Sequence, residues 1–139
     1  MSTPYNRSFR PSFPTLMIYL RNGDTIKGPF LALLDTGADV TFVPLALLED
    51  IEALEAFSGR VRSHFGESRP VQLYVVAFQV ENLALASSYV VADEDGDDII
   101  LGRDVLNKLP LFLDGASQQT NLLNDVMVNR IRNRRQRSV

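Results

Sequence analysis

The chain has 139 residues, of which 45% are hydrophobic and 22% are charged, as is typical of one globular domain with a single core. It has no cysteine and one histidine, so disulfides, thiolate nucleophiles and cysteine-based metal sites are excluded, and a Ser-His-Asp triad would have to use His64. Five of the 14 basic residues lie between Arg130 and Arg137, so the net charge of -3 conceals an acidic body and a basic tail.

Residues 1–14 contain three prolines, which supply no donor to a strand ladder, so we expect an irregular leader or edge segment. The first ten residues are polar and lack the apolar region of a signal peptide. No apolar run approaches the roughly 18 residues of a membrane span. These features favour a cytoplasmic location.

Two short apolar runs, residues 16–20 and 29–34, flank a turn that contains Asn22-Gly23, a strong hairpin signal. They predict two antiparallel strands, the second of which runs into Asp35. A further strand is expected over residues 40–43, which are mostly β-branched or aromatic.

Pro44 suits the first turn of a helix. Apolar residues then recur at helical spacing with acidic residues between them, and they predict an amphipathic helix of about three turns; they are Leu47, Leu48, Ile51 and Leu54.

The second half of the chain predicts short strands separated by turns. A mobile hairpin or loop is expected over residues 58–70, which contain Gly59 and Gly66. The segments that follow predict strands at 71–80, 84–91 and 99–101, a helical stretch at 105–109 and a final hairpin at 111–123. Many short strands at this spacing favour a small, mainly β fold.

Residues 93–98, Asp-Glu-Asp-Gly-Asp-Asp, have two interpretations. Asp93, Asp95 and Asp97 match alternate ligand positions of a calcium-binding EF-hand loop. However, Asp98 stands where that loop needs glycine, and Asp104 stands where it needs glutamate. A solvated acidic turn is the better hypothesis.

The strongest signal surrounds Asp35, in Leu-Leu-Asp-Thr-Gly-Ala-Asp over residues 33–39. An ionised carboxylate at the end of an apolar run loses hydration unless it finds partners, which favours a functional carboxylate. Asp-Thr-Gly alone is also typical of an ordinary Asx turn. A second segment, Ile-Ile-Leu-Gly-Arg-Asp-Val-Leu over residues 99–106, makes the combination far more specific.

Together these segments resemble the retropepsin-like aspartic proteases, single-domain relatives of pepsin found in retroviruses, transposons and bacteria. The resemblance covers roughly residues 15–115 in the order of elements. It implies a mainly β fold, namely a small closed β-barrel of the acid-protease type with one or two short helices, built as a symmetric dimer. We expect a leader at 1–14, a protease domain at 15–120 and a basic tail at 121–139 that could be helical.

The resemblance implies an aspartic endopeptidase. In this family two carboxylates share one proton across a bound water, and a chain that supplies only Asp35 must pair with a second copy. The homodimer interface would be isologous, and the two carboxylates would titrate as a coupled dyad. The substrate would be a polypeptide, and neither a metal nor an organic cofactor is implied.

The same resemblance gives roles to the residues after Asp35. Thr36 matches the threonine whose hydroxyl bonds across the dimer to the opposite loop. Gly37 lies where substrate backbone approaches, so a side chain there would block the cleft. Ala38 and Asp39 match positions that line the cleft, with Asp39 accepting a hydrogen bond from substrate backbone.

In the second segment, Gly102 matches the residue that allows a tight turn under the active-site loop, and Arg103 matches the arginine that pairs with Asp39. A flap over the cleft is expected near His64, Phe65 and Gly66. Retroviral flaps are glycine-rich at the tip, whereas this one has a single glycine. A catalytically weak or inactive dimerisation or peptide-binding module is therefore the alternative function.

The lone His64 is interpreted as an exposed loop residue, because the dyad mechanism requires no imidazole. The basic tail could contact an acidic partner or nucleic acid, but it lacks the interleaved aromatic residues that stack on bases, so a solvated, partly disordered end is favoured. One apolar helix face could lead into the tail and pack on the body or on the dimer partner; it comprises Leu122, Leu123, Val126, Met127 and Ile131.

Overall fold

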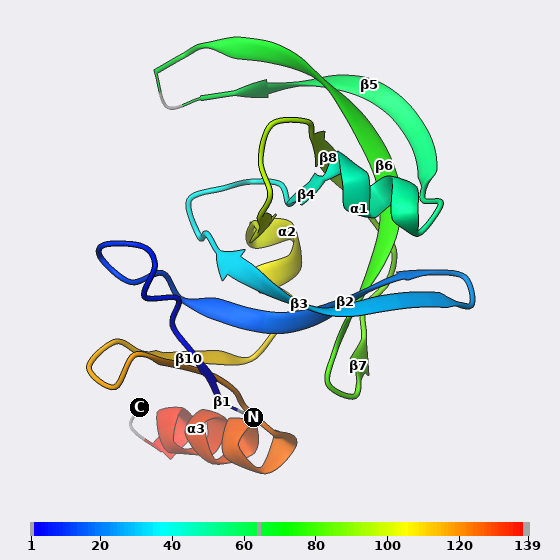
Figure 1. The fold of residues 1–139 in the computed structure, drawn as a ribbon. Helices are drawn as coiled ribbons and strands as arrows, with labels where there is room; N and C mark the ends of the chain where they lie inside the picture. Colours follow the sequence, from blue (N-terminus) through cyan, green and yellow to red (C-terminus); the bar gives the residue numbers. More distant parts are fainter. Residues whose placement is uncertain (1, 64, 138–139) are drawn as a thin grey trace.

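Six strands of the computed structural model, which describes residues 2–63 and 65–137, close into a small barrel (Figure 1). In spatial order they are β2 (Thr15–Asn22), β3 (Thr25–Leu34), β9 (Ile99–Leu101), β4 (Phe42–Pro44), β8 (Ser88–Asp93) and β6 (Ser68–Val80). The ring closes because β6 also pairs with β2. The predicted closed β-barrel is therefore confirmed.

Two further strands extend β6 beyond the ring. The long β5 (Leu54–Arg62) pairs with the first half of β6 and the short β7 (Leu83–Ala84) with its end. A separate antiparallel sheet joins the two ends of the chain in the order β1 (Ser2–Pro4), β11 (Gln119–Leu122) and β10 (Leu111–Asp114). Residues 1–14 thus include a paired strand, together with an isolated bridge between Asn6 and Phe13.

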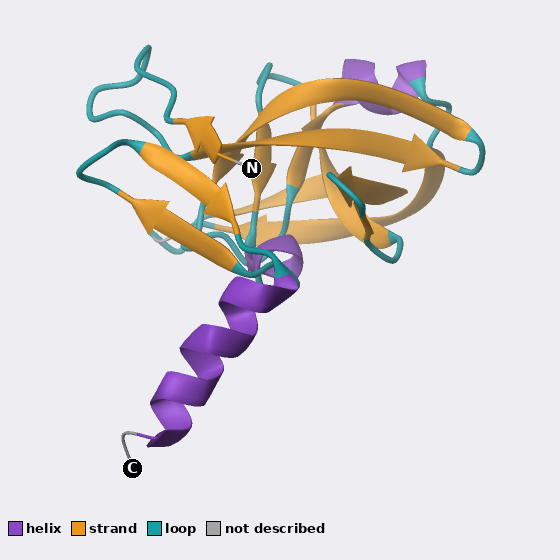
Figure 2. Cartoon of the chain, turned by 90° about the horizontal axis from the view of Figure 1, so that it is seen from below, coloured by secondary structure: helices purple, strands orange, loops and turns teal. Residues whose placement is uncertain are grey.

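Three helices accompany the strands in the described part of the chain. The short α1 (Leu45–Asp50) and α2 (Arg103–Leu106) follow β4 and β9. The longer α3 (Asp125–Arg137) projects away from the body (Figure 2). Among the described residues, no helix has the length and apolarity needed to cross a membrane.

The predicted hairpin of β2 and β3 is confirmed, and it delivers Asp35 to its position. Gly23 supplies the left-handed turn conformation with a φ of 59°. β3 ends at Leu34, where it runs parallel to β9 with Leu34 opposite Leu101. The two sequence segments that carried the resemblance therefore lie side by side at one end of two buried strands.

The barrel interior is apolar and fixes these strand ends in space. Leu16, Ile18 and Leu20 alternate along β2 with no exposed surface, and Phe78 lies among them from β6. Burial of each such side chain contributes about 1.5–3 kcal/mol. A rigid core therefore holds the loop that follows β3.

The predicted three-turn helix after Pro44 is wrong in length. α1 stops at Asp50, and Glu52 adopts a left-handed φ of 53° while the Ala53 N–H bonds to the Leu48 carbonyl. Leu54 then opens β5 opposite Val75 of β6. Long-range strand pairing overrides the helical spacing of the apolar residues.

Two other boundaries differ from prediction. The strand expected at 84–91 is divided into β7 and β8, and the Leu85 N–H bonds to the Phe78 carbonyl between them. The helix expected at 105–109 begins earlier, at Arg103, and after Leu106 it continues only as single turns. Leu122 belongs to β11 and not to the C-terminal helix face.

Candidate active site

Asp35 begins a tight turn at the end of β3, and its backbone and side chain are both held. Its N–H donates to the Leu101 carbonyl at 2.9 Å, and its carbonyl accepts the Ala38 N–H at 3.2 Å. The Gly37 N–H donates to carboxylate Oδ1 at 2.9 Å. The bond from Gly37 orients the carboxylate. The Asp35 residue is only half-buried, so it remains accessible from solvent.

The next two residues of the turn are exposed. A Cβ added to Gly37 would lie 3.2 Å from the Asp35 carboxylate, so even alanine would crowd that oxygen. Among the described residues, no group bonds the Thr36 hydroxyl, whose cross-dimer role remains a prediction. Ala38 is half-buried and Asp39 exposed.

Arg103, the first residue of α2, ties down this loop at three points. Its guanidinium forms an ion pair with Asp39, as expected from the sequence, and donates from Nη1 to the Thr36 carbonyl at 2.8 Å. Its backbone N–H donates to the Ala38 carbonyl at 2.8 Å. Because both charged side chains are substantially exposed, the ion pair contributes about 0–1 kcal/mol and acts mainly to orient the loop.

Gly102 is buried directly under the same loop. A Cβ at this position would lie 2.6 Å from the Val40 carbonyl oxygen and 3.0 Å from that of Ala38. Both contacts are with backbone, which cannot rotate away as a side chain could. Glycine is therefore required for the loop to pack on α2.

A buried hydrogen-bond network beneath the loop was missed by the sequence analysis. The Thr41 hydroxyl donates to Asp104 Oδ1 at 2.7 Å and accepts the Gly102 N–H at 3.0 Å. The Thr41 N–H donates to Asp104 Oδ2 at 3.2 Å. The only sequence signal was a threonine inside the otherwise apolar run 40–43, and nothing in that run identifies its partner. The structure shows that this threonine has no exposed surface.

The hairpin of β5 and β6 extends over the same side of the molecule as the Asp35 loop (Figure 1). The last strand pair is Arg62 with Ser68, and the Ser63 N–H bonds to the Glu67 carbonyl at 2.8 Å across the tip. Gly66 has a φ of 83° and Phe65 is 93% exposed. His64, the third predicted flap residue, lies outside the described residues.

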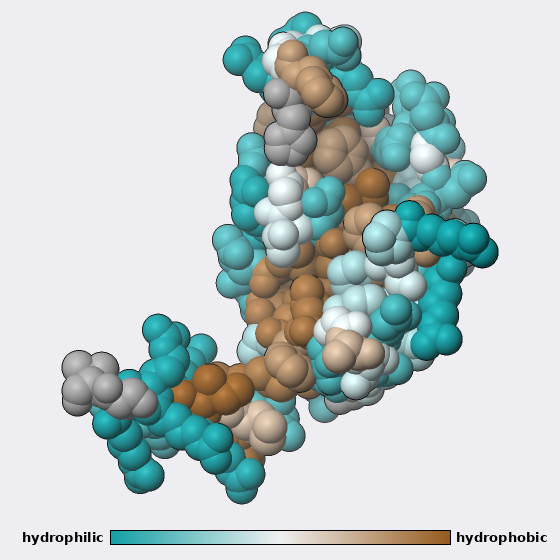
Figure 3. Space-filling model, turned by 90° about the vertical axis from the view of Figure 1, so that its left-hand side faces the viewer, coloured by the Kyte–Doolittle hydropathy of each residue, from teal (hydrophilic) through white to brown (hydrophobic). Residues whose placement is uncertain are grey.

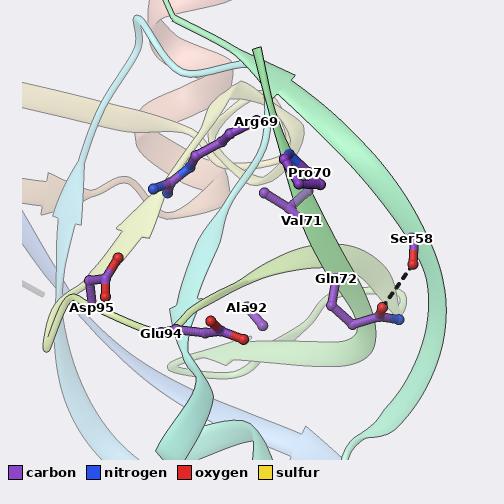
Figure 4. A pocket seen from close by; sticks show the side chains of 8 residues that line it. All are labelled: Ser58, Arg69, Pro70, Val71, Gln72, Ala92, Glu94 and Asp95. Carbon is purple, nitrogen blue, oxygen red and sulfur yellow. Dashed lines mark hydrogen bonds between the residues drawn. The ribbon is translucent and has the colours of Figure 1, made fainter. Parts of the chain in front are cut away.

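A cavity of about 250 Å³ lies between the middle of this hairpin and the chain at the end of β8 (Figure 4). Its walls carry both signs of charge, and the Ser58 hydroxyl donates to Gln72 Oε1 at 3.1 Å beside it. The lining residues are Ser58, Arg69, Pro70, Val71, Gln72, Ala92, Glu94 and Asp95. Asp35 is not among them.

The acidic segment after β8 is organised by Asp93. Its Oδ1 accepts the N–H groups of Asp95 at 3.1 Å and Gly96 at 2.9 Å, which is an Asx turn. Within the described ranges, no three His, Cys, Asp or Glu side chains are grouped to hold a metal ion.

Comparison with known proteins agrees with the architecture. The family described as aspartyl protease matches residues 18–105, which is more than half of the chain. The structure is similar to the EIAV protease solved in complex with the inhibitor HBY-793, at 22% identity and a TM-score of 0.52, covering 69% of this chain and 86% of that one. No curated protein matches the sequence. The similarity to the EIAV protease shows a shared fold. The family match spans residues 18–105, which include both Asp35 and Gly102, and it shows that the chain belongs to the aspartyl protease family.

Proposed function

We propose that this protein is an aspartic endopeptidase that acts as a homodimer, with one Asp35 from each copy. The observation that supports this is that the other carboxylates near the Asp35 turn are already bound by neighbouring side chains. Asp39 is bound by Arg103, and Asp104 is bound by Thr41. Among the described residues, only the Gly37 N–H bonds the Asp35 carboxylate, so in this proposal the second acid that the reaction needs comes from a second copy.

The chemistry follows from two carboxylates held face to face. Mutual repulsion keeps both from ionising, so the pair holds one proton. The ionised Asp35 takes a proton from water as the water oxygen attacks the peptide carbonyl carbon, and the protonated Asp35 gives its proton to the carbonyl oxygen. The tetrahedral intermediate collapses as the C–N bond breaks: the nitrogen receives the proton held by one Asp35, and one hydroxyl of the intermediate returns a proton to the other Asp35. The products are a carboxylic acid and an amine, and the dyad again holds one proton.

The neighbours of Asp35 position the substrate in this proposal. The Thr36 hydroxyl bonds across the dimer axis and holds the two turns rigid. Gly37 leaves room for substrate backbone, and Ala38 and Asp39 line the cleft. The flap residues Phe65 and Gly66 cover the bound peptide. Exposure of Phe65 supports this last role, because an apolar ring at a hairpin tip gains by contact with a ligand.

The test is cleavage of unfolded polypeptides at mildly acidic and neutral pH by three proteins. Asp35→Asn removes the acid without changing its size, and Asp24→Asn makes the same chemical change in the exposed β2–β3 turn. We expect cleavage by wild type and Asp24→Asn and none by Asp35→Asn. Equal cleavage by Asp35→Asn would contradict the proposal, and a dimeric wild type that does not cut would favour the peptide-binding module.

A further inference from the structure

We propose that α3 is a docking arm that packs against a second copy of this chain, through the side of the helix that carries Met127 and Ile131. The inference rests on the proposed homodimer and adds a contact outside the barrel. Its occupant is the partner protomer that supplies the second Asp35.

The helix α3 has no core of its own. It has 13 residues, and none of them is buried. Its start is capped, since Asn124 Oδ1 accepts the Met127 N–H at 2.9 Å. An isolated helix of this length is only marginally stable in water even when capped, so most of its stability must come from packing against another surface.

One side of α3 is apolar and is left partly exposed by the described part of the chain. Met127 and Ile131 are four residues apart and therefore lie on one face, where they are 42% and 46% exposed. Val126 is more exposed still, but it lies about 100° around the helix from Met127, toward the side of Asn129. Asn129 and Asn133 have the same spacing on the opposite side. The apolar side of α3 is thus the narrow stripe formed by Met127 and Ile131, and the two asparagines lie on the other side of the helix.

The helix α3 and the rest of the chain carry opposite net charges. Residues 125–137 carry five arginines and one aspartate, whereas residues 1–124 carry nine basic and 16 acidic side chains. A helix with this excess of positive charge is attracted to an acidic surface. The body of a second copy is such a surface, and complementary charge would favour and orient its approach.

The position of α3 also suits a contact with the partner protomer. Figure 3 views the side of the molecule that carries the loop between β3 and β4, and it shows a band of apolar surface that runs down the body and continues onto α3. A partner that brings its Asp35 to this side would also meet the apolar side of α3. One protomer could therefore cover both surfaces.

The experiment compares two double variants of the full chain that add the same charge at the same spacing. Met127→Glu/Ile131→Glu places two carboxylates on the apolar side, and Asn129→Glu/Asn133→Glu places them on the polar side. Sedimentation equilibrium gives the dimer dissociation constant, and circular dichroism checks that each variant is folded. We expect the first variant to raise the dissociation constant about tenfold or more and the second less than about threefold.

Three outcomes would overturn the docking arm. If neither variant changes the dissociation constant, α3 does not contact the partner. If both raise it equally, α3 acts through net charge alone and its apolar side is not in the interface. A loss of RNA binding by the first variant with an unchanged dimer would identify nucleic acid as the occupant instead.

Failure of this inference is distinguishable from failure of the proposed function. Asp35 is intact in both variants, so a weakened dimer should recover wild-type cleavage per chain when the protein concentration is raised. Wild-type cleavage with unchanged dimers would reject only the arm. A weakened dimer in a protein whose wild type never cuts would reject only the protease.

Discussion

Replacement of Thr41 by valine tests the buried network that supports the Asp35 loop. The side chain is fully buried, and valine has nearly the same shape, so packing is retained while two hydrogen bonds are lost. A hydrogen bond to a charged group contributes about 1.5–3 kcal/mol, and a buried donor left without an acceptor costs about 1–3 kcal/mol. We expect Thr41→Val to lower the free energy of unfolding by about 3 kcal/mol.

The chain offers a matched control in Thr120. This residue is also fully buried, but its hydroxyl has no hydrogen-bond partner among the described residues. Thr120→Val should therefore leave stability unchanged or raise it by about 1 kcal/mol. Thr41→Ser keeps the hydroxyl and loses a methyl group, which costs about 1 kcal/mol.

Urea unfolding followed by circular dichroism gives the free energies of unfolding of the three variants. In thermal melting, the Tm of Thr41→Val should lie about 10 °C below that of wild type. The reasoning would be refuted if Thr41→Val and Thr120→Val changed stability equally. It would also be refuted if Thr41→Ser cost as much as Thr41→Val, because the hydroxyl would then contribute nothing.

Three further substitutions follow from the geometry of the loop and the flap. Gly102→Ala should lower stability by about 2 kcal/mol or more in urea unfolding, since its Cβ would meet backbone oxygen; no loss would contradict that contact. Arg103→Lys should change stability by less than about 1 kcal/mol but lower cleavage, because one amine cannot bond Asp39 and the Thr36 carbonyl as a fork does; unchanged kcat/KM would argue against its role. Phe65→Ser should leave stability within about 0.5 kcal/mol and raise KM, and an unchanged KM would remove Phe65 from the flap function.

Local signals predicted the parts of the fold that depend on local chemistry. Asn22-Gly23 predicted the first hairpin because few residues adopt the left-handed turn conformation that Gly23 has. The apolar runs before Asp35 and Gly102 predicted buried strands, and the structure pairs them in parallel. The ion pair of Arg103 with Asp39 came from the resemblance, not from the spacing of the residues.

Features that depend on distant partners could not be predicted in the same way. Leu54 fits a helical face by spacing, but β6 pairs with it and converts the segment into strand. Thr41 and Asp104 form their bond across 63 positions of sequence, and neither residue alone indicates the other. The limit is physical, because hydrophobic periodicity reports which side of an element is buried and not which element buries it.

The central claim is that one active site contains two Asp35 residues from two copies of the chain. Mixing wild type with a ninefold excess of Asp35→Asn, after subunit exchange, tests it most directly, with wild type at the same total concentration as reference. If both carboxylates are needed, only dimers of two wild-type chains cut, and cleavage per wild-type chain should fall to about one tenth. Cleavage per wild-type chain that is unchanged by the excess would show that a single Asp35 is sufficient and would contradict the account.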